Sequence, residues 1–369
     1  MDIQAAVARA GETGFRIETL QMGPLGAGEV RVRIAGVGLC HTDLQMRATG
    51  EGWYPFPAVF GHEGAGVVEA VGDGVSRVAV GDAVVASFRA CGVCRPCGRA
   101  EPAGCEAMLA LNFSGRRADG TTALSDGEGP VSSHFFGQSS FASHATVHES
   151  ALVKVDDCPD LALLGPLGCG VQTGAGAIMH SHGARAGDGL LVMGGGSVGL
   201  SAVMAGAIVG CAPIIVLEPH AARRALALEL GASHVLDPAA TPDLAAAVRA
   251  IVPRGVDHVF DTTGRTALLV AAMGCLARRG TLGLVAGSAA EGALPLDCMG
   301  LVGQGQRVIG IIEGDSDPQI FIPELLAHYR AGRLPFDRMI RTYPLVEINT
   351  AIADHHAGVV VKAVLIPGQ

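Results

Sequence analysis

Four cysteines lie close together in one short stretch of the sequence, CGVCRPCGRAEPAGC. They are Cys91, Cys94, Cys97 and Cys105, with the spacing C-x2-C-x2-C-x7-C. Four thiolates on one loop can surround a Zn²⁺ ion tetrahedrally at about 2.3 Å per sulfur. The bacterial ferredoxin pattern ends with a spacer of three residues and a following proline, and this loop has neither. Because a four-thiolate site leaves no open position, we expect a structural zinc in residues 91–105.

A second pattern, G-x-G-x-x-G, is formed by Gly194, Gly196 and Gly199 and includes Val198. A β-type run precedes it and a helix-like run follows, which is the context that a dinucleotide site requires. Glu218 ends the next apolar run, about 20 residues further on. The glycines allow a pyrophosphate to approach the helix N-terminus, and the carboxylate can bind ribose hydroxyls. The pattern predicts NAD(H) binding.

Preference for NAD over NADP follows from the same carboxylate, because Glu218 would repel a 2′-phosphate. Arg223 and Arg224 lie close enough in the sequence to weaken that preference, although both could be solvated helix charges.

Cys169 stands apart from the cysteine loop, in the stretch LGPLGCGVQTG. A lone cysteine among apolar residues usually acts as a small hydrophobic side chain. A catalytic zinc needs three protein ligands and one open position, and Cys40 in GLCHTD and His62 in FGHEGAG are candidate partners. No spacing rule links these three residues. Taken alone, composition and spacing favour a structural role for each.

The elements that would position these residues change character along the chain. The first part is β-rich, as in EVRVRIAGV, where Val30, Val32 and Ile34 alternate with arginines. From about residue 160, apolar strands such as LLVMGG and PIIVLE alternate with alanine-rich helical segments. This alternation predicts an α/β fold with a parallel sheet covered by helices on both faces. A helix and a final strand, GVVVKAVLIP, close the chain.

Composition and charge exclude several classes of function. The chain has 369 residues, 49% of them apolar, and 26 basic against 35 acidic residues give a net charge of −9. That balance disfavours a nucleic-acid or membrane partner. The uncharged run Leu190–Leu217 is long enough to cross a bilayer, but a buried βαβ unit explains it better.

The N-terminus lacks a signal-peptide pattern, so we expect a cytoplasmic protein whose cysteines bind metal rather than form disulfides. The remaining four cysteines are interpreted as core or incidental: Cys158, Cys211, Cys275 and Cys298.

The motifs CHTD, GHEGAGVVEAVG, the four-cysteine loop and the glycine motif occur in the order found in zinc-dependent medium-chain alcohol dehydrogenases, and the sequence resembles that family over essentially its whole length. CHTDLQ, NFSG, HFFGQSSFASHA, GPLGCGVQTGAGA and IEGDSDPQIFIPEL are more specifically similar to aryl (benzyl) alcohol dehydrogenases and their terpene-alcohol relatives. The resemblance implies a β-rich GroES-like catalytic domain, residues 1–170 and 314–369. It also implies a Rossmann domain with a doubly wound parallel sheet, residues 171–313.

The resemblance also implies roles around a catalytic zinc. Cys40, His62 and Cys169 would bind the metal, since two cysteines and one histidine are the catalytic zinc ligands of alcohol dehydrogenases. Thr42 would pass the alcohol proton towards the cofactor ribose. Asp43 would orient His62 through its second ring nitrogen. With the structural site, each chain would hold two zinc ions.

Further roles carried over by resemblance concern the cofactor and the metal. Glu63 would be an acid able to approach the metal during ligand exchange, and Thr173 would contact the nicotinamide. His41 and Lys362 would face the pyrophosphate, and Arg223 the adenosine ribose. Plain structural interpretations stay open: Thr42 as an ordinary hydroxyl, Glu63 as a buried ion-pair partner, Lys362 as a solvated strand charge.

One position departs from many relatives. They end the proton relay with a histidine five residues after the first zinc cysteine, where this chain has Gln45. Glutamine does not titrate near neutral pH, so it cannot be the terminal base. We expect the proton to leave through the ribose to water, or through His41.

The predicted function is reversible, NAD-dependent oxidation of primary aromatic or allylic terpene alcohols to aldehydes by hydride transfer. The alternatives are a glutathione-dependent formaldehyde dehydrogenase, a short-chain aliphatic alcohol dehydrogenase, and a catalytically silent member that binds zinc and nucleotide. Phe88, Phe113 and Phe141 could line the substrate pocket or could belong to the core. The expected partners are a small-molecule alcohol or aldehyde and further copies of the chain, in a homodimer or homotetramer.

Overall fold

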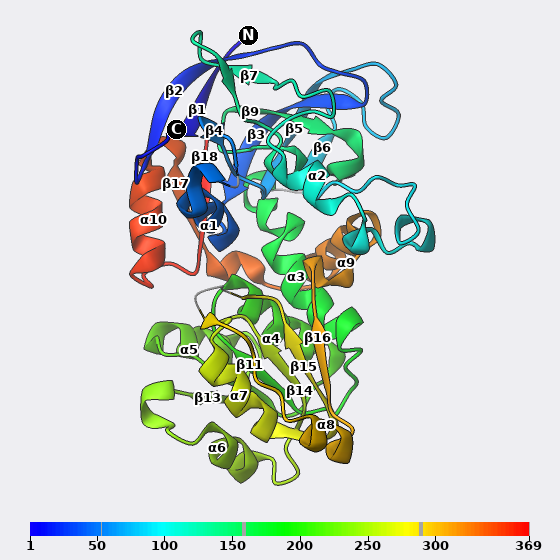
Figure 1. Cartoon of the computed structure of the whole chain (residues 1–369), viewed down its shortest axis with the longest axis vertical. Helices are drawn as coiled ribbons and strands as arrows, with labels where there is room; N and C mark the ends of the chain where they lie inside the picture. Colours follow the sequence, from blue (N-terminus) through cyan, green and yellow to red (C-terminus); the bar gives the residue numbers. More distant parts are fainter. Residues whose placement is uncertain (53, 157–159, 288–290, 369) are drawn as a thin grey trace. The chain divides into compact units, whose positions relative to one another are not determined.

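The computed structural model describes residues 1–52, 54–156, 160–287 and 291–368 (Figure 1). Its internal contacts divide the chain into two units. The first contains Met1–Cys169, Asp317–Leu325 and Asp337–Gln369, and the second contains Gly170–Ser316 and Leu326–Phe336. The chain therefore returns to the first unit at residue 317 rather than at 314, and residues 326–336 belong with the second unit.

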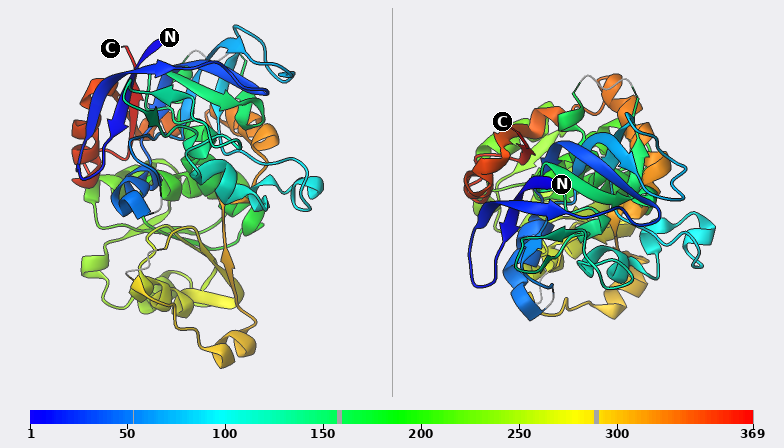
Figure 2. Two further views of the ribbon diagram at one scale, coloured as in Figure 1. Left: turned by 45° about the horizontal axis from the view of Figure 1, so that its top comes forward. Right: turned by 90° about the horizontal axis from the view of Figure 1, so that it is seen from above.

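The first unit contains a five-stranded antiparallel sheet. Its strands are β1 (Asp2–Ala8), β2 (Phe15–Met22), β4 (Ala58–Val59), β7 (Leu124–Ser125) and β8 (Pro130–Val131). They are ordered β4-β1-β2-β7-β8, and Figure 2 shows β1 and β2, in blue, running alongside each other.

A seven-stranded sheet forms the rest of the barrel-like framework of this unit. Its strands are β3 (Glu29–Gly38), β5 (Gly64–Val71), β6 (Ala83–Ala86), β9 (His144–His148), β10 (Leu152–Lys154), β17 (Ile340–Pro344) and β18 (Lys362–Ile366). The order is β10-β6-β5-β3-β18-β17, with β9 also paired to β3. The pairs are antiparallel except β17 with β18.

The alternating sequence of β3 explains why this sheet has one apolar face. Val30, Val32 and Ile34 are buried, whereas Arg33 on the opposite face is exposed. The buried faces pack into one core in which Phe15 meets Phe141 edge to face at 5.8 Å. The predicted β-rich character of the first part of the chain is confirmed.

The second unit contains a six-stranded sheet in which each strand is parallel to its neighbours. Its strands are β11 (Leu190–Met193), β12 (Ile214–Leu217), β13 (His234–Leu236), β14 (Val256–Asp261), β15 (Leu276–Leu284) and β16 (Arg307–Gly310). The order is β13-β12-β11-β14-β15-β16. Numbered along the chain, this is the 3-2-1-4-5-6 order of the Rossmann fold, so the predicted α/β class is confirmed. The strands β11 and β12 are buried throughout, which explains their continuous apolar runs.

Helices connect and flank these sheets (Figure 1). In the first unit they include α1 (His41–Thr49), α2 (Met108–Phe113) and α10 (Ile348–His356). In the second they are α3 (Gly170–Gly176), α4 (Ser197–Val209), α5 (Ala221–Glu229), α6 (Leu244–Ile251), α7 (Thr266–Cys275) and α8 (Cys298–Gln304). The helix α9 (Pro318–Arg330) begins in the first unit and ends in the second.

From the sequence we expect no membrane-spanning segment, and we expect the scattered cysteines to lie in the core or to be incidental. Among the described residues no single helix is long and apolar enough to span a membrane; one bent pair, Leu161–Gly168 with Gly170–Ser181, meets the length and composition requirement. Cys211 and Cys275 are buried and Cys298 is exposed. Cys158 lies outside the described residues.

Candidate zinc and nucleotide sites

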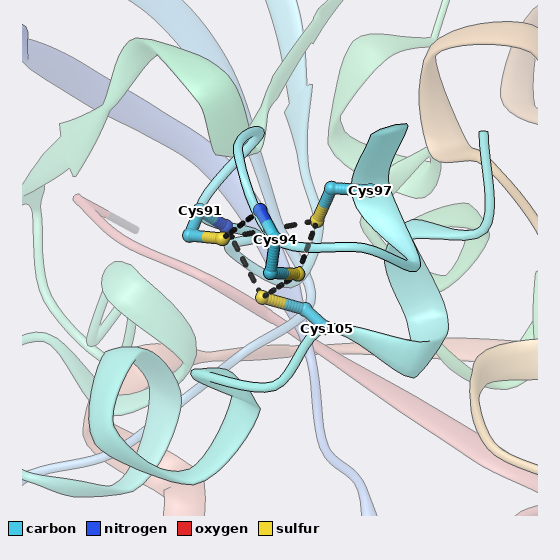
Figure 3. A group of neighbouring side chains, drawn as sticks. All are labelled: Cys91, Cys94, Cys97 and Cys105. Atoms are coloured by element: carbon cyan, nitrogen blue, oxygen red, sulfur yellow. Dashed lines mark hydrogen bonds between the residues drawn. The ribbon is translucent and has the colours of Figure 1, made fainter. Parts of the chain in front are cut away.

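The four-cysteine loop brings its sulfur atoms together, as Figure 3 shows. The Sγ atoms of Cys91, Cys94, Cys97 and Cys105 all lie within 4.8 Å of one another. Contacts of 3.4, 3.9 and 4.0 Å join neighbouring Sγ atoms in this group. A tetrahedron with 2.3 Å zinc–sulfur bonds has sulfur–sulfur edges of about 3.8 Å, and a disulfide would need about 2.05 Å. The cluster therefore fits a four-thiolate zinc site.

Backbone donors favour thiolates in this loop. Cys94 N donates to Cys91 Sγ, and Cys91 N donates to Cys105 Sγ, both at 3.3 Å. The backbone N–H groups of Val93 and Cys94 lower the pKa of Cys91 to about 6. A thiolate is the form of cysteine that binds zinc, so Cys91 is prepared for metal. Burial raises the pKa of Cys97 and of Cys105, so a zinc ion would have to displace protons from these two thiols.

A second cluster assembles from three distant segments of the first unit. Cys40 precedes α1, His62 lies between β4 and β5, and Cys169 follows the short helix Gly165–Gly168. Their ligand atoms, together with a carboxylate oxygen of Glu63, all lie within 4.8 Å of one another. The structure thus brings together the three residues that resemblance assigns to a catalytic zinc.

Asp43 holds two of these segments in place. Its Oδ2 accepts from Cys40 N at 3.1 Å, and its Oδ1 accepts from Gly61 N at 3.0 Å. The same Oδ1 lies 2.8 Å from His62 Nδ1, and neither side chain is exposed. A carboxylate bound to Nδ1 leaves Nε2 as the ring nitrogen that faces the two cysteines, the arrangement common in zinc–histidine–carboxylate sites.

The chemistry of the donor set fits a divalent cation. His62 Nε2 is buried and has no hydrogen-bond partner among the described residues. A hydrogen bond with Cys169 lowers the pKa of Cys40 well below its usual value. Burial would lower the pKa of His62, but Asp43 and Cys40 raise it well above its usual value. The site therefore favours positive charge, which a zinc ion bound by two thiolates and an imidazole would supply.

Glu63 is also buried at this site, where its carboxylate pairs with Lys362 on β18. Lys362 Nζ lies 2.7 and 2.8 Å from the two Glu63 oxygens and donates to Leu39 O at 3.2 Å. A Cβ on Gly38 would come within 1.9 Å of Glu63 Oε2, so only glycine leaves room for this carboxylate. Lys362 is 2% exposed and is not a solvated strand charge.

An aromatic group surrounds the imidazole of His62. Phe136 stacks on the ring with centroids 4.3 Å apart and planes at 25°, and Phe135 meets it edge to face at 5.5 Å. Phe113 contacts both phenylalanines at 5.0 and 5.7 Å. The side chains beside the candidate ligands are therefore largely apolar and aromatic.

The three phenylalanines that the sequence offers as lining of the substrate pocket lie in different parts of the first unit. Phe113 belongs to the aromatic group beside His62, whereas Phe141 packs in the barrel core against Phe15. Phe88 lines a separate hollow beside Cys97 of the four-cysteine loop. The sequence reasoning did not select Phe136, which makes the closest ring contact with His62.

The glycine motif connects β11 to α4 in the second unit. Gly194 has φ +101°, and a Cβ on Gly199 would lie 1.9 Å from Gly194 O. Both positions therefore need glycine: Gly194 for its left-handed backbone conformation, and Gly199 for the close approach of the helix to the turn. Gly196 is the N-cap of α4, and Val198 lies in the first turn.

Glu218 follows β12 directly and is 3% exposed. Its Oε2 accepts from Gly195 N at 2.6 Å, while its Oε1 accepts from His220 N at 2.8 Å and lies 2.6 Å from His220 Nδ1. The carboxylate is thus fixed beside the glycine turn, where the predicted ribose would bind. Arg224 donates to Glu218 O at 2.8 Å and pairs with Asp237 at 3.0 Å.

The remaining predicted residues lie on helices. His41 and Gln45 are exposed on α1, and Thr42 Oγ1 lies 3.7 Å from Cys40 Sγ. Thr173 is buried in α3, which packs against α4 so closely that a Cβ on the adjacent Gly174 would meet Val198 O. Arg223 lies in α5, after the Glu218 turn. The functional roles of all these residues stay predictions.

This fold and these sites define a class of protein. It is the zinc-binding dehydrogenases that have a GroES-like domain and a Rossmann unit. The alcohol dehydrogenase GroES-like domain profile matches residues 26–157, and the zinc-binding dehydrogenase profile matches residues 197–327. The chain is 47% identical over 365 residues to a geraniol dehydrogenase of Castellaniella defragrans, covering 98% of this chain and 97% of that one.

Solved structures agree with this comparison. An alcohol dehydrogenase zinc-binding domain protein from Burkholderia ambifaria has a TM-score of 0.96 at 46% identity, covering 99% of both chains. Benzyl alcohol dehydrogenase from Acinetobacter calcoaceticus has a TM-score of 0.94 at 37% identity, covering 100% of both chains. The chain belongs to the zinc-dependent medium-chain alcohol dehydrogenase family, and the predicted resemblance is confirmed.

Proposed function

We propose that this protein is an NAD-dependent dehydrogenase of primary allylic terpene alcohols and benzyl-type alcohols, which it oxidises reversibly to aldehydes. The observation that carries the proposal is the aromatic group of Phe113, Phe135 and Phe136 beside His62. Flat, unsaturated substrates pack well against such rings. Two relatives support the choice, one named for geraniol and the other for benzyl alcohol.

The mechanism follows from the residues around the candidate catalytic site. When bound, zinc would supply Lewis acidity at this site and NAD would supply a hydride acceptor. Cys40, His62 and Cys169 hold the metal, while Asp43 fixes the orientation of the imidazole. The Thr42 hydroxyl, next to Cys40, would take up the alcohol proton and release its own towards the cofactor ribose, from which a proton leaves to water or through His41.

Phe135 and Phe136 are buried against His62 and leave an apolar environment beside the candidate ligands, which would favour hydride transfer over reactions with water. In the second unit, Glu218 would accept hydrogen bonds from the ribose hydroxyls of bound NAD, and the N-terminus of α4 would hold the pyrophosphate. The carboxylate of Glu218 disfavours a 2′-phosphate, which supports NAD as the cofactor.

The first test is NADH formation by the purified protein with NAD and, separately, geraniol, benzyl alcohol, ethanol, and formaldehyde with glutathione. Zinc is counted on the same sample. The proposal requires strong turnover of geraniol or benzyl alcohol, weak turnover of ethanol, and two zinc ions per chain. Preference for formaldehyde with glutathione would assign the protein to that alternative, and no turnover despite two zinc ions would favour a silent member.

A homodimer formed through the parallel sheet is the assembly that we propose. β16 is the last strand of its sheet and has no partner on one side among the described strands. Exposed apolar side chains lie close to it in the sequence, including Met299 at 79% and Val302 at 77% exposure. An unpaired edge with apolar neighbours is suited to pairing with a second copy. Light scattering after gel filtration distinguishes a dimer from a tetramer or monomer, and Val302→Glu should shift the mass towards the monomer.

A further inference from the structure

A strained loop packs against the segment that carries His62, one of the candidate zinc ligands. Between residues 134 and 139, three non-glycine residues have left-handed backbone angles: φ is 73° at His134, 51° at Phe136 and 55° at Ser139. Each such residue costs of order 1–3 kcal/mol and persists only where the surrounding structure imposes it. Strain concentrated in one loop marks it for a functional role.

Gln138 lies inside this loop, is 1% exposed, and uses both ends of its amide. Its Nε2 donates to His62 O at 2.9 Å and to Ser87 O at 3.3 Å. Its Oε1 accepts from Gly64 N at 3.1 Å and from Ser140 Oγ at 2.8 Å. The amide therefore spans Glu63 and holds the backbone directly after His62, because it binds the His62 carbonyl and the Gly64 N–H.

Ser87 extends this contact to another ligand. Its carbonyl accepts from Gln138, and its Oγ donates to Gly168 O at 2.6 Å. Gly168 immediately precedes Cys169, and Ser87 is completely buried. A continuous chain of hydrogen bonds thus runs from the backbone of His62 through Gln138 and Ser87 to the residue before Cys169.

We propose that Gln138 and Ser87 are positioning residues that set the separation and orientation of His62 and Cys169 at the catalytic zinc. Asp43 already fixes the His62 ring from one side and the backbone of Cys40 from the other. Gln138 and Ser87 perform the matching task for the His62 backbone and for Cys169. Together these residues tie all three ligands into one buried hydrogen-bonded framework.

The residue types fit this assignment. An asymmetric amide can donate to two carbonyls and accept from two donors at once, which neither glutamate nor methionine can do. Buried networks of this kind rigidify a site when each group is satisfied, and ligand-supporting hydrogen bonds typically affect metal affinity or activity by about 10–100-fold. The proposal rests on Cys40, His62 and Cys169 being the zinc ligands.

The deciding variant is Gln138→Glu, which keeps acceptors for Gly64 N and Ser140 Oγ but removes the donors to His62 O and Ser87 O. Its matched control is Gln319→Glu, because Gln319 Nε2 also donates to a backbone carbonyl, Leu152 O, at 2.9 Å. Both proteins are loaded with Co²⁺ in place of zinc, since visible cobalt spectra report ligand geometry. The four-thiolate site serves as an internal reference in each spectrum.

We expect Gln138→Glu to shift the cobalt bands of the two-cysteine, one-histidine site and to release zinc from that site to a chelator about 10–100-fold faster. Its kcat falls while KM for NAD stays the same, and the control matches the wild type. A loss of thermal stability with unchanged cobalt bands and zinc release would overturn the proposal. Wild-type protein that binds metal only in the four-thiolate loop would instead overturn the ligand assignment.

Ser87→Ala provides a milder test should Gln138→Glu fail to fold, because it removes one hydroxyl from the chain of hydrogen bonds. We expect faster zinc release than in the wild type, and release restored towards the wild-type rate in Ser87→Thr, which returns the hydroxyl. Release at the wild-type rate in Ser87→Ala would exclude Ser87 from positioning Cys169.

Discussion

Lys362 Nζ lies 2.7 Å from Glu63 Oε2, and the two side chains are only 2% and 0% exposed. Burial alone would lower the pKa of Lys362, but Glu63, Cys40 and Cys169 together raise it to about 12. Burial also raises the pKa of Glu63, against the opposing effect of Lys362. The two charges therefore stabilise each other, since removing either one takes the nearest opposite charge away from a buried ion.

Lys362→Met should reduce the free energy of unfolding of the first unit by about 3–5 kcal/mol, because it leaves the Glu63 carboxylate buried without its partner. Adding Glu63→Gln in the same chain should recover much of that loss. Urea unfolding of the four members of this double-mutant cycle measures the coupling. A coupling near zero would contradict a buried pair and would favour the pyrophosphate role for Lys362, which a raised KM for NAD would reveal.

Asp43→Asn should lower zinc affinity at the catalytic site and kcat by about 10–100-fold. The asparagine cannot hold His62 Nδ1 and the two backbone N–H groups with the same charge-assisted hydrogen bonds. Zinc release to a chelator and steady-state kinetics measure the two effects. Asp126→Asn is a suitable control, since that carboxylate pairs with Arg9 and is not one of the residues in the candidate zinc cluster. Equal zinc release in both variants would refute a positioning role for Asp43.

Cys97→Ser should reduce the zinc content from two ions to one per chain and lower the midpoint of thermal unfolding. Its Sγ lies 3.4 Å from Cys94 Sγ, within the cluster that a single ion can crosslink. The exposed Cys298→Ser variant is the control. Metal analysis and calorimetry measure the outcome, and an unchanged zinc content would show that the loop does not bind zinc.

Glu218→Gln should reduce the preference for NAD over NADP by roughly 10–100-fold, which corresponds to loss of a charge-assisted hydrogen bond worth about 1.5–3 kcal/mol. The change also removes the repulsion of a 2′-phosphate, while Arg223 and Arg224 remain nearby. The ratio of kcat/KM for the two cofactors is the measurement. Glu229→Gln, an exposed carboxylate on α5, should leave that ratio unchanged. Equal ratios in wild type and Glu218→Gln would place the ribose elsewhere.

His182 makes the second unit sensitive to acid. Both of its ring nitrogens are buried without a hydrogen-bond partner among the described residues, and the ring packs against His258 at 5.1 Å. Burial, reinforced by His258, lowers the pKa of His182 to about 3. A lowered folded-state pKa means that stability is present above about pH 6.5 and falls as the pH drops towards 3, by up to about 1.4 kcal/mol per pH unit.

His182→Leu should therefore raise the thermal midpoint, and its advantage over the wild type should grow between pH 7.5 and pH 5. Removing an unsatisfied buried polar group contributes about 1–3 kcal/mol. Thermal scans at several pH values measure this, with His234→Leu on the surface of the same unit as the control. An advantage independent of pH would show that folding does not lower the pKa of His182.

Local patterns predicted much of this molecule. The four-cysteine loop and the glycine turn are encoded within short stretches, so their spacing alone indicates which ligand they bind. The six parallel strands follow from apolar runs that alternate with helical segments. The return of the chain to the first unit at residue 317 was harder to predict, because the composition of the sequence does not change there.

The catalytic cluster could not be derived from spacing, because Cys40, His62 and Cys169 come from three separate segments. Only resemblance joined them before the structure was known. Gln138 and Phe136 were not selected at all. Their positions depend on left-handed backbone angles at non-glycine residues, for which the sequence carries no signal.

The two metal clusters differ in how much of the chain must exist before each can form. The sulfur atoms of the four-cysteine loop come from a single hairpin-sized segment, so this loop can capture zinc while later residues are still being synthesised. The other cluster needs Cys169 and a sheet that β18 completes by pairing Val364 with Gly38. The four-cysteine cluster thus depends on contacts within residues 91–105, whereas the other cluster depends on residues that lie far apart in the sequence and meet only when the first unit folds.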